Sequence, residues 1–165
     1  MKQIRYTTPH GDIIFPAEVD SVTSHLASSD WTTWDCSGNA EACLDVASTT
    51  KLDEDLKFEE TLDAFGTFFV YRTDPCIVIK QPDPGLFFLT WFEDGDELVP
   101  YNGGDIHQFL LSHCGGNPFQ CPLPCLTELP ATISIVRQFV DTLSRSTVVD
   151  WVSWFNLDIP EDWYT

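Results

Sequence analysis

Three cysteines and two histidines in the second half of the sequence are the residues that could bind a metal ion. Three residues separate Cys121 from Cys125, six residues separate Cys114 from Cys121, and His107 and His113 lie nearby. Structural zinc needs four ligands, which usually come in close pairs such as Cys-x2-Cys. The second pair is missing and prolines interrupt the segment. We therefore expect buried thiols, with one opportunistic disulfide as an alternative, and no metal.

The sequence gives even less support for a nucleophilic active site or for a nucleotide-binding site. Any cysteine and histidine could meet in space, but no local feature favours one of the 6 cysteines over the others. His10 and His25 stand alone in polar sequence, which predicts surface histidines. Gly103-Gly104 and Gly115-Gly116 belong to neither a phosphate-binding loop nor a dinucleotide fingerprint. We expect a protein that is not an enzyme and needs no cofactor.

Clustered carboxylates are the most frequent chemical feature of the chain. Glycoside hydrolysis needs two carboxylates on opposite sides of a bond, in a pocket that raises the pKa of one. Acids packed into turns are instead solvated, and the short Asp94-Gly95-Asp96 run lacks the longer ligand pattern of a calcium loop. Either a solvated face or a docking surface for a basic partner fits these runs. They are Glu93-Asp94, Asp96-Glu97, Asp53-Glu54-Asp55 and Glu59-Glu60.

The charge balance of the chain bears on which partners it can have. Lys and Arg number 8 against 26 Asp and Glu, which gives a formal net charge of −18. Nucleic-acid binding needs basic side chains to neutralise phosphates, so we expect no nucleic acid as a partner. Between Ser29 and Asp105 there are 17 acids and only 4 bases. Such a field speeds encounter with a basic protein, although selection for solubility or for high salt would also produce it.

Aromatic residues beside these acids suggest where a partner would bind. Trp91 leads through Phe92 into the acidic run 93–97, and Trp163 and Tyr164 lie in the acidic tail 156–165. An aromatic anchor ringed by charges is typical of interface hot spots, while a core position for Trp91 is the alternative. The candidate partner-binding residues are Trp91, Glu93, Asp94, Asp96, Glu97, Asp83, Asp53, Glu54 and Asp55.

The elements that would position these residues follow from hydrophobic periodicity and turn residues. The first half predicts strands at 2–6, 12–15 and 42–46, a helix that starts at Pro16, and a loop-plus-helix over 51–65. An antiparallel meander follows at 68–72, 76–80, 86–92 and 97–101, with a further strand at 106–111. Residues 115–124 are too proline-rich for regular structure.

The C-terminal third predicts one clear helix and one strand. Pro130 starts the helix, with Ile133, Val136, Val140 and Leu143 along one side and Phe139 beside them, and a buried strand spans 147–155. At 165 residues with 43% hydrophobic content, the chain fits one domain with a real core. The sequence therefore predicts a single α+β domain over residues 1–165, with helices packed on a central antiparallel sheet.

Neither a membrane span nor a secretion signal is expected from the sequence. No run of 18 apolar residues exists, and the N-terminal residues run into polar sequence without an apolar signal region. We expect a cytoplasmic protein that does not contact the membrane, in which the cysteines stay reduced.

The order of elements near the C-terminus resembles a known family. After a proline-bounded entry at Leu123-Pro124, a helix carries Val136-Arg137-Gln138-Phe139, and a strand carries Val148-Val149-Asp150-Trp151-Val152-Ser153-Trp154. With the meander before it, this layout resembles the small immunity proteins of bacterial polymorphic toxin systems. More narrowly, it is similar to the family often paired with nucleic-acid deaminase toxins.

The resemblance implies a function without catalytic residues. Immunity proteins bind and plug a cognate toxin, whose nucleic-acid groove is often basic, so an acidic face can imitate the charge of the substrate. The expected function is therefore toxin neutralisation through an acidic surface. The alternative is an acidic nucleic-acid mimic, inhibitor or scaffold, such as one encoded by a phage, that binds a basic host protein.

Overall fold

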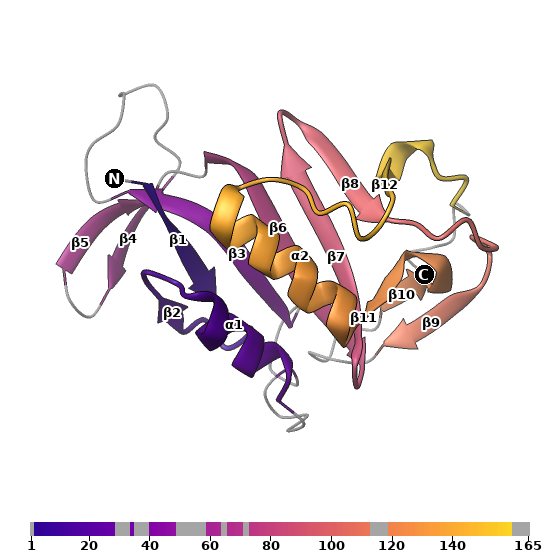
Figure 1. The fold of residues 1–165 in the computed structure, drawn as a ribbon, viewed down its shortest axis with the longest axis horizontal. Helices are drawn as coiled ribbons and strands as arrows, with labels where there is room; N and C mark the ends of the chain where they lie inside the picture. Colours follow the sequence, from indigo (N-terminus) through magenta and orange to yellow (C-terminus); the bar gives the residue numbers. More distant parts are fainter. Residues whose placement is uncertain are drawn as a thin grey trace.

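The main sheet contains strands from both ends of the chain. The computed structural model describes residues 2–28, 34, 40–48, 59–63, 66–70, 73–112 and 119–159. The strands of the main sheet are β1 (Lys2–Thr7), β2 (Ile13–Ile14), β3 (Glu41–Ser48), β6 (Thr73–Asp83), β7 (Leu86–Glu93), β8 (Asp96–Pro100), β11 (Leu126–Glu128) and β12 (Trp151–Ser153). Within the described residues they form one antiparallel sheet in the order β12-β8-β7-β6-β3-β1-β2, and β11 pairs with β7 (Figure 1).

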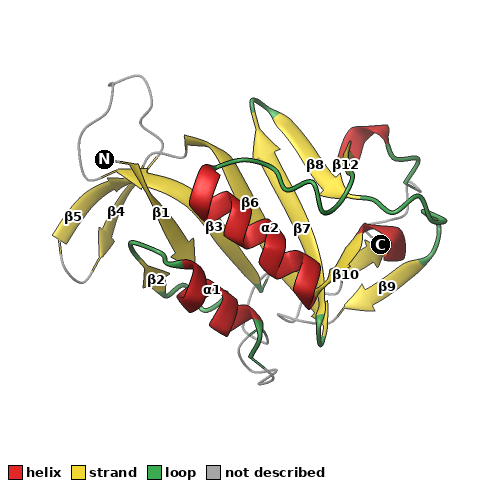
Figure 2. Cartoon of the chain, viewed as in Figure 1, coloured by secondary structure: helices red, strands yellow, loops and turns green. Residues whose placement is uncertain are grey.

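Two helices lie on the same face of this sheet. They are α1 (Val19–Leu26) and α2 (Leu129–Thr142), which pack side by side over the strands (Figure 2). The remaining elements are the pair β4 (Glu59–Asp63) and β5 (Gly66–Val70), the pair β9 (Phe109–Ser112) and β10 (Phe119–Pro122), and the short 3-10 helices η3 (Leu123–Cys125) and η4 (Trp154–Asn156). The predicted α+β fold is confirmed.

The core lies between the sheet and the two helices. Alternate residues of β7 point toward the helices, so Phe87, Leu89 and Trp91 are all fully buried. The Trp91 ring contacts Phe139 of α2 edge-on, with a centroid separation of 5.5 Å. Val22 of α1 is buried in the same cluster. Burial of large rings on both layers is the main source of stability in this fold.

Helix α2 begins where the sequence predicts, and Val136, Phe139, Val140 and Leu143 of the predicted stripe face the core. Pro130 lies in its first turn, which suits the fixed φ of proline. Of the predicted stripe only Val136 is fully buried, while Ile133, Val140 and Leu143 are half-buried. The buried residues are Thr132, Ile135, Val136 and Phe139. The sequence did not predict the burial of Thr132, because this residue is polar; its hydroxyl donates a hydrogen bond to the Glu128 carbonyl.

The central part of the predicted meander is confirmed. Strands β6, β7 and β8 follow one another in sequence and in space, joined by tight turns. The predicted first strand of the meander is placed differently, because Gly66–Val70 pairs with β4 rather than with β6. Glu59–Asp63 is therefore a strand, and the helix prediction over 51–65 is wrong for these residues. The rest of that segment lies outside the described residues.

Three other predictions from the sequence need correction. The strand expected at 106–111 starts only at Phe109, because the Asp105 carboxylate accepts a hydrogen bond from the His107 backbone and holds a turn. The segment expected to be irregular contains β10, which pairs with β9. The buried strand expected at 147–155 shrinks to the half-buried Trp151–Ser153. Phe155 is 74% exposed, so the apolar residues there do not all face inward.

Strand β7 is paired on both of its edges, and one edge is shared by two strands. Its Trp91–Glu93 part pairs with β8, and its Leu86–Phe88 part pairs with β11. The buried Thr127 hydroxyl reinforces the second pairing by donating to the Phe87 carbonyl at 3.3 Å. Strand β7 is therefore the element on which the N-terminal and C-terminal parts of the fold meet.

Candidate functional site

The turn between β7 and β8 is the most strongly acidic turn that the structure describes. Glu93 pairs with Asp96, so Asp94 and Gly95 form a two-residue connection. Both have positive φ, 52° for Asp94 and 84° for Gly95, which defines a type I′ turn. Asp and Gly are among the few residues that adopt this backbone readily. The sequence therefore builds a rigid acidic tip.

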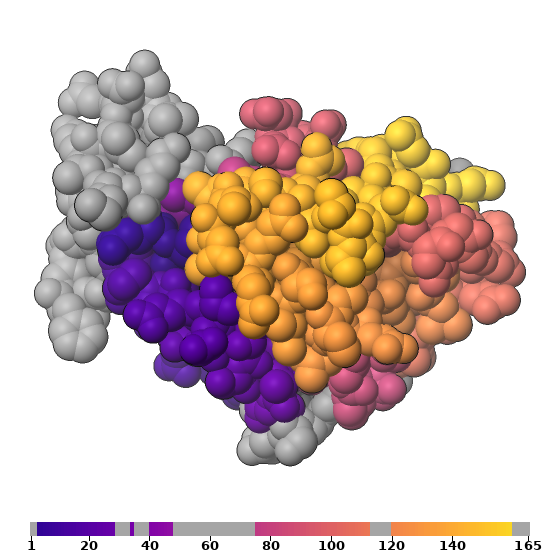
Figure 3. Space-filling view, viewed as in Figure 1, coloured from indigo at the N-terminus to yellow at the C-terminus, as the bar shows by residue number. Residues whose placement is uncertain are grey.

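The four acids of this turn, Glu93, Asp94, Asp96 and Glu97, differ in how much charge they offer a partner. Asp94 and Asp96 are exposed, and the turn projects beyond α2 at the top of the molecule in Figure 3. The Glu93 carboxylate accepts a hydrogen bond from Trp91 Nε1 at 3.1 Å and lies 3.6 Å from Arg145 Nε. Partial burial raises the pKa of Glu97 above its usual range. Asp94 and Asp96 are thus the strongest candidates for contact.

Trp91 does not serve as an exposed anchor beside these acids. Its side chain is fully buried and also contacts Trp151, with a centroid separation of 5.9 Å. Only its indole N–H reaches outward, to Glu93. The prediction of Trp91 as a partner-binding residue is corrected, and the core alternative is confirmed. The period-two pattern of Phe87, Leu89 and Trp91 carried this signal in the sequence.

Of the remaining acids predicted to bind a partner, Asp83 does not join this turn. Asp83 is exposed in the β6–β7 turn, at the opposite end of β7. Strand β7 spans eight residues, so the two turns are separated by roughly 25 Å. Asp53, Glu54 and Asp55 lie outside the described residues. A single acidic face including Asp83 and Glu93–Glu97 is therefore not formed by β7.

Most basic side chains in the described part of the chain are already paired. Arg5 Nε donates to Asp45 Oδ1 at 2.8 Å, and a second guanidinium nitrogen contacts Oδ2. Lys80 Nζ lies 2.8 Å from Glu41 Oε1, and Arg145 faces Glu93. Arg137 is exposed on α2. Arg5, Lys80 and Arg145 therefore pair with Asp45, Glu41 and Glu93, while Asp94 and Asp96 are exposed.

A half-buried histidine is the main feature that sequence reasoning missed. His25 was expected at the surface, but its Nδ1 lies 2.7 Å from the Tyr6 hydroxyl and its ring packs between Tyr6 and Trp34. Burial raises the pKa of Tyr6, so the phenol keeps its proton while it lies within hydrogen-bond distance of His25 Nδ1. Burial, followed by the nearby His10, lowers the pKa of His25.

This histidine should make the stability of the fold depend on pH. The unfolded chain takes up a proton near the usual pKa of about 6.5, whereas folded His25 resists protonation until lower pH. We expect the free energy of unfolding to fall as pH decreases from about 7 to about 5.5. Urea denaturation gives the free energy of unfolding at each pH. Its change between the two pH values should be smaller for His25→Gln than for the exposed control His107→Gln. An equal difference in both variants would contradict the assignment.

The described cysteines behave as buried thiols. Cys43, Cys76, Cys121 and Cys125 are not in disulfides, and all except Cys43 are fully buried. Burial raises the pKa of Cys125 to about 12 and also raises the pKa of Cys121, which keeps both thiols protonated. A hydrogen bond to Cys76 and burial raise the pKa of Cys43. These groups are poor nucleophiles, in agreement with the prediction of buried thiols.

Metal-binding clusters, membrane-spanning helices and similarity to known sequences each bear on what this chain could do. Among the described residues, no three His, Cys, Asp or Glu side chains converge to hold a metal ion. No described helix combines the length and apolar character needed to cross a membrane. No protein-family model matches the sequence, and a search of curated proteins finds no match either.

Proposed function

We propose that the chain is an immunity protein that neutralises a cognate bacterial toxin by binding a basic surface of that toxin. The observation that supports this proposal is the β7–β8 turn, where Asp94 and Asp96 are exposed on a backbone fixed by a type I′ conformation. A rigid charged tip loses little conformational entropy on binding, and its field accelerates encounter with a partner of opposite charge.

The buried part of the site supports the same proposal by holding the tip in place. Glu93 is tied to the indole of Trp91, which is itself fixed in the core against Phe139. The side of the turn nearest the core is therefore anchored, and Asp94 and Asp96 are exposed on its outer side. Neutralisation then requires only stoichiometric binding over the basic groove of the toxin, with no chemical step.

A charge substitution at the tip tests the proposal directly. The partner to use is the product of the gene adjacent to this one, tested for toxicity and for its binding to the chain. We expect Asp94→Asn with Asp96→Lys to weaken binding at low salt by about tenfold or more, mainly through slower association, and to reduce the salt dependence. Asparagine is chosen at Asp94 because it tolerates positive φ. Glu93 is left unchanged so that its bond to Trp91 is kept.

The matched control makes the same charge change far from the tip. Asp12→Asn with Asp20→Lys alters two exposed acids on the β1–β2 turn and α1 and should bind within about twofold of the unaltered chain. Equal effects of both variants would assign binding to net charge rather than to the tip. An adjacent gene product that is neither toxic nor bound would overturn the proposal. Capture of a basic host protein instead would favour the alternative of an acidic inhibitor.

A further inference from the structure

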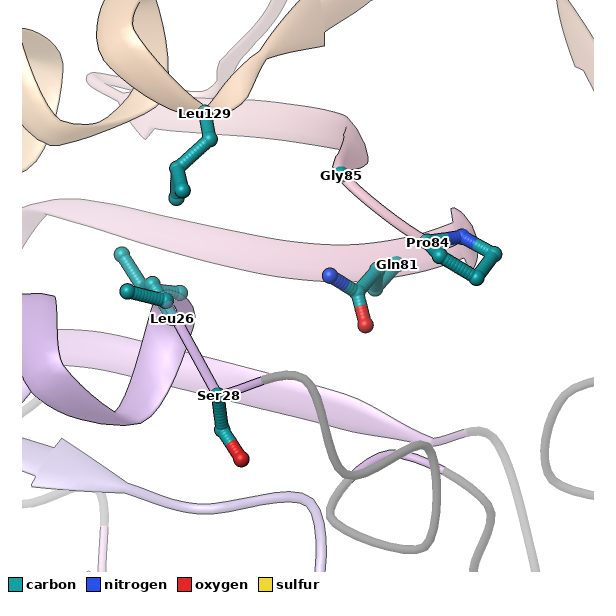
Figure 4. Close-up of a pocket in the computed structure, with 7 residues that line it drawn as sticks. Leu26, Ser28, Gln81, Pro84, Gly85 and Leu129 are labelled. Carbon is teal, nitrogen blue, oxygen red and sulfur yellow. The ribbon is translucent and has the colours of Figure 1, made fainter.

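A cavity of about 240 Å³ opens at one end of the core, where both helices reach the end of the sheet. The C-terminal end of α1 forms one wall, the first residue of α2 forms another, and the β6–β7 turn forms the third (Figure 4). Its lining residues are Leu26, Ala27, Ser28, Gln81, Pro84, Gly85 and Leu129. The wall is therefore mainly apolar, with few polar groups.

Gln81 occupies a position that the strand pattern reserves for an apolar side chain. Ile77 and Ile79 precede it on the helix-facing side of β6 and are fully buried. Gln81 is only 4% exposed, so it is as much a part of the interior as these isoleucines are. Pro82 follows it, and the β6–β7 pairing shifts register between Lys80 and Asp83, as expected where proline removes a backbone donor.

The carboxamide of Gln81 points into the cavity. Figure 4 shows its nitrogen and oxygen directed into the space bounded by Leu26, Ser28 and Leu129. No other described residue forms a hydrogen bond with this carboxamide. Its nitrogen and oxygen are not among the fully buried polar atoms that lack a hydrogen-bond partner, so solvent in the cavity reaches them. A ligand that displaces this solvent must offer hydrogen bonds in return, because a buried amide without a partner is unfavourable.

We infer that the cavity between α1, α2 and the β6–β7 turn binds a small uncharged molecule that has an apolar body and one amide group. The Gln81 carboxamide provides a donor and an acceptor side by side, which match the acceptor and donor of an amide. Leu26, Pro84 and Leu129 contact the apolar body. Cavities for drug-sized ligands measure roughly 300–1,000 Å³, so this one suits a smaller molecule.

The charge of the protein argues against an ionic ligand in this cavity. With a net charge of −18, the chain repels anions, and none of the described residues that line the cavity is an acid that could pair with a cation. The site is far from the exposed acids of the β7–β8 turn, because it lies at the opposite end of β7. Ligand binding here does not depend on the proposed binding of a toxin.

The experiment compares two probes of nearly the same shape by NMR titration. Benzamide has the required donor and acceptor, whereas acetophenone has a methyl group in place of the amide nitrogen. We expect benzamide to shift the side-chain amide signals of Gln81 and the methyl signals of Leu26 and Leu129. Acetophenone should bind about tenfold more weakly, since one hydrogen bond is lost. The benzoate anion should leave these signals unchanged.

A variant identifies the carboxamide as the binding group. Gln81→Met keeps the volume, and we expect it to abolish the preference for benzamide over acetophenone, while Gln108→Met, at an exposed glutamine, keeps that preference. Equal affinity for the two probes, or a preference that survives Gln81→Met, would overturn the inference. Absence of shifts at Gln81, Leu26 and Leu129 would show that water alone fills the cavity. If Gln81→Met does not fold, the affinities of benzamide and acetophenone for the unaltered chain still test the inference.

Discussion

Replacing Trp91 with alanine is expected to lower the free energy of unfolding by about 3–5 kcal/mol. The substitution removes a fully buried ring that contacts Phe139 and Trp151, and it leaves a cavity between the sheet and α2. It also frees the Glu93 carboxylate from the indole N–H. Urea denaturation followed by circular dichroism measures the change, because the tryptophan fluorescence itself is altered.

The control for this prediction is another large aromatic residue near the chain surface. Phe155 is 74% exposed, so Phe155→Ala should change stability by less than about 0.5 kcal/mol. Trp91→Phe should cost less than Trp91→Ala because part of the ring volume is kept. If Trp91→Ala kept nearly full stability but lost affinity for a partner, Trp91 would act at an interface and its assignment to the core would be wrong.

Replacing Arg5 with methionine is expected to lower the free energy of unfolding by about 3 kcal/mol. The Arg5 and Asp45 side chains are 14% and 5% exposed, so removing the guanidinium leaves a buried carboxylate without its bidentate partner. The double variant Arg5→Met with Asp45→Leu should recover most of the loss, since a buried ion pair is often replaced by apolar residues without net cost. The free energies of unfolding of Arg5→Met, Asp45→Leu and the double variant give the coupling energy between the two side chains.

Lys80 and Glu41 provide the comparison for this pair. They also pair across neighbouring strands, but their side chains are 22% and 36% exposed, so solvent screens the interaction. Lys80→Met should therefore change the free energy of unfolding by no more than about 1 kcal/mol. A similar loss for Arg5→Met and Lys80→Met would mean that burial does not set the strength of the Arg5–Asp45 pair.

Features with local causes could be predicted from the sequence. Asp94-Gly95 specifies its own turn through positive φ, and Pro130 marks the first turn of α2, so neither needs information from distant residues. The strands that flank the two turns of β7 could also be predicted, because their aromatic and β-branched residues are bounded by Pro, Asp and Gly. These segments make up the central part of the sheet.

The features that could not be predicted depend on contacts between distant residues. His25 lies in polar sequence, and its burial requires Tyr6 and Trp34 to pack against it. Glu59–Asp63 has a helical spacing of leucines nearby, yet pairing with Gly66–Val70 makes it a strand. The acidic neighbours of Trp91 suggested a surface position, whereas its contact with Phe139 in α2 determines its burial.

The shared edge of β7 has a consequence for synthesis of the chain on the ribosome. Phe87 and Thr127, which bond across this edge, are separated by 40 positions in the sequence. At about 5–20 residues per second, the ribosome needs roughly 2–8 s to make the second partner after the first. During that time the Leu86–Phe88 backbone cannot pair with β11 and could pair with the edge of another nascent chain. Aggregation during expression should therefore depend on how quickly residues 126–128 follow β7.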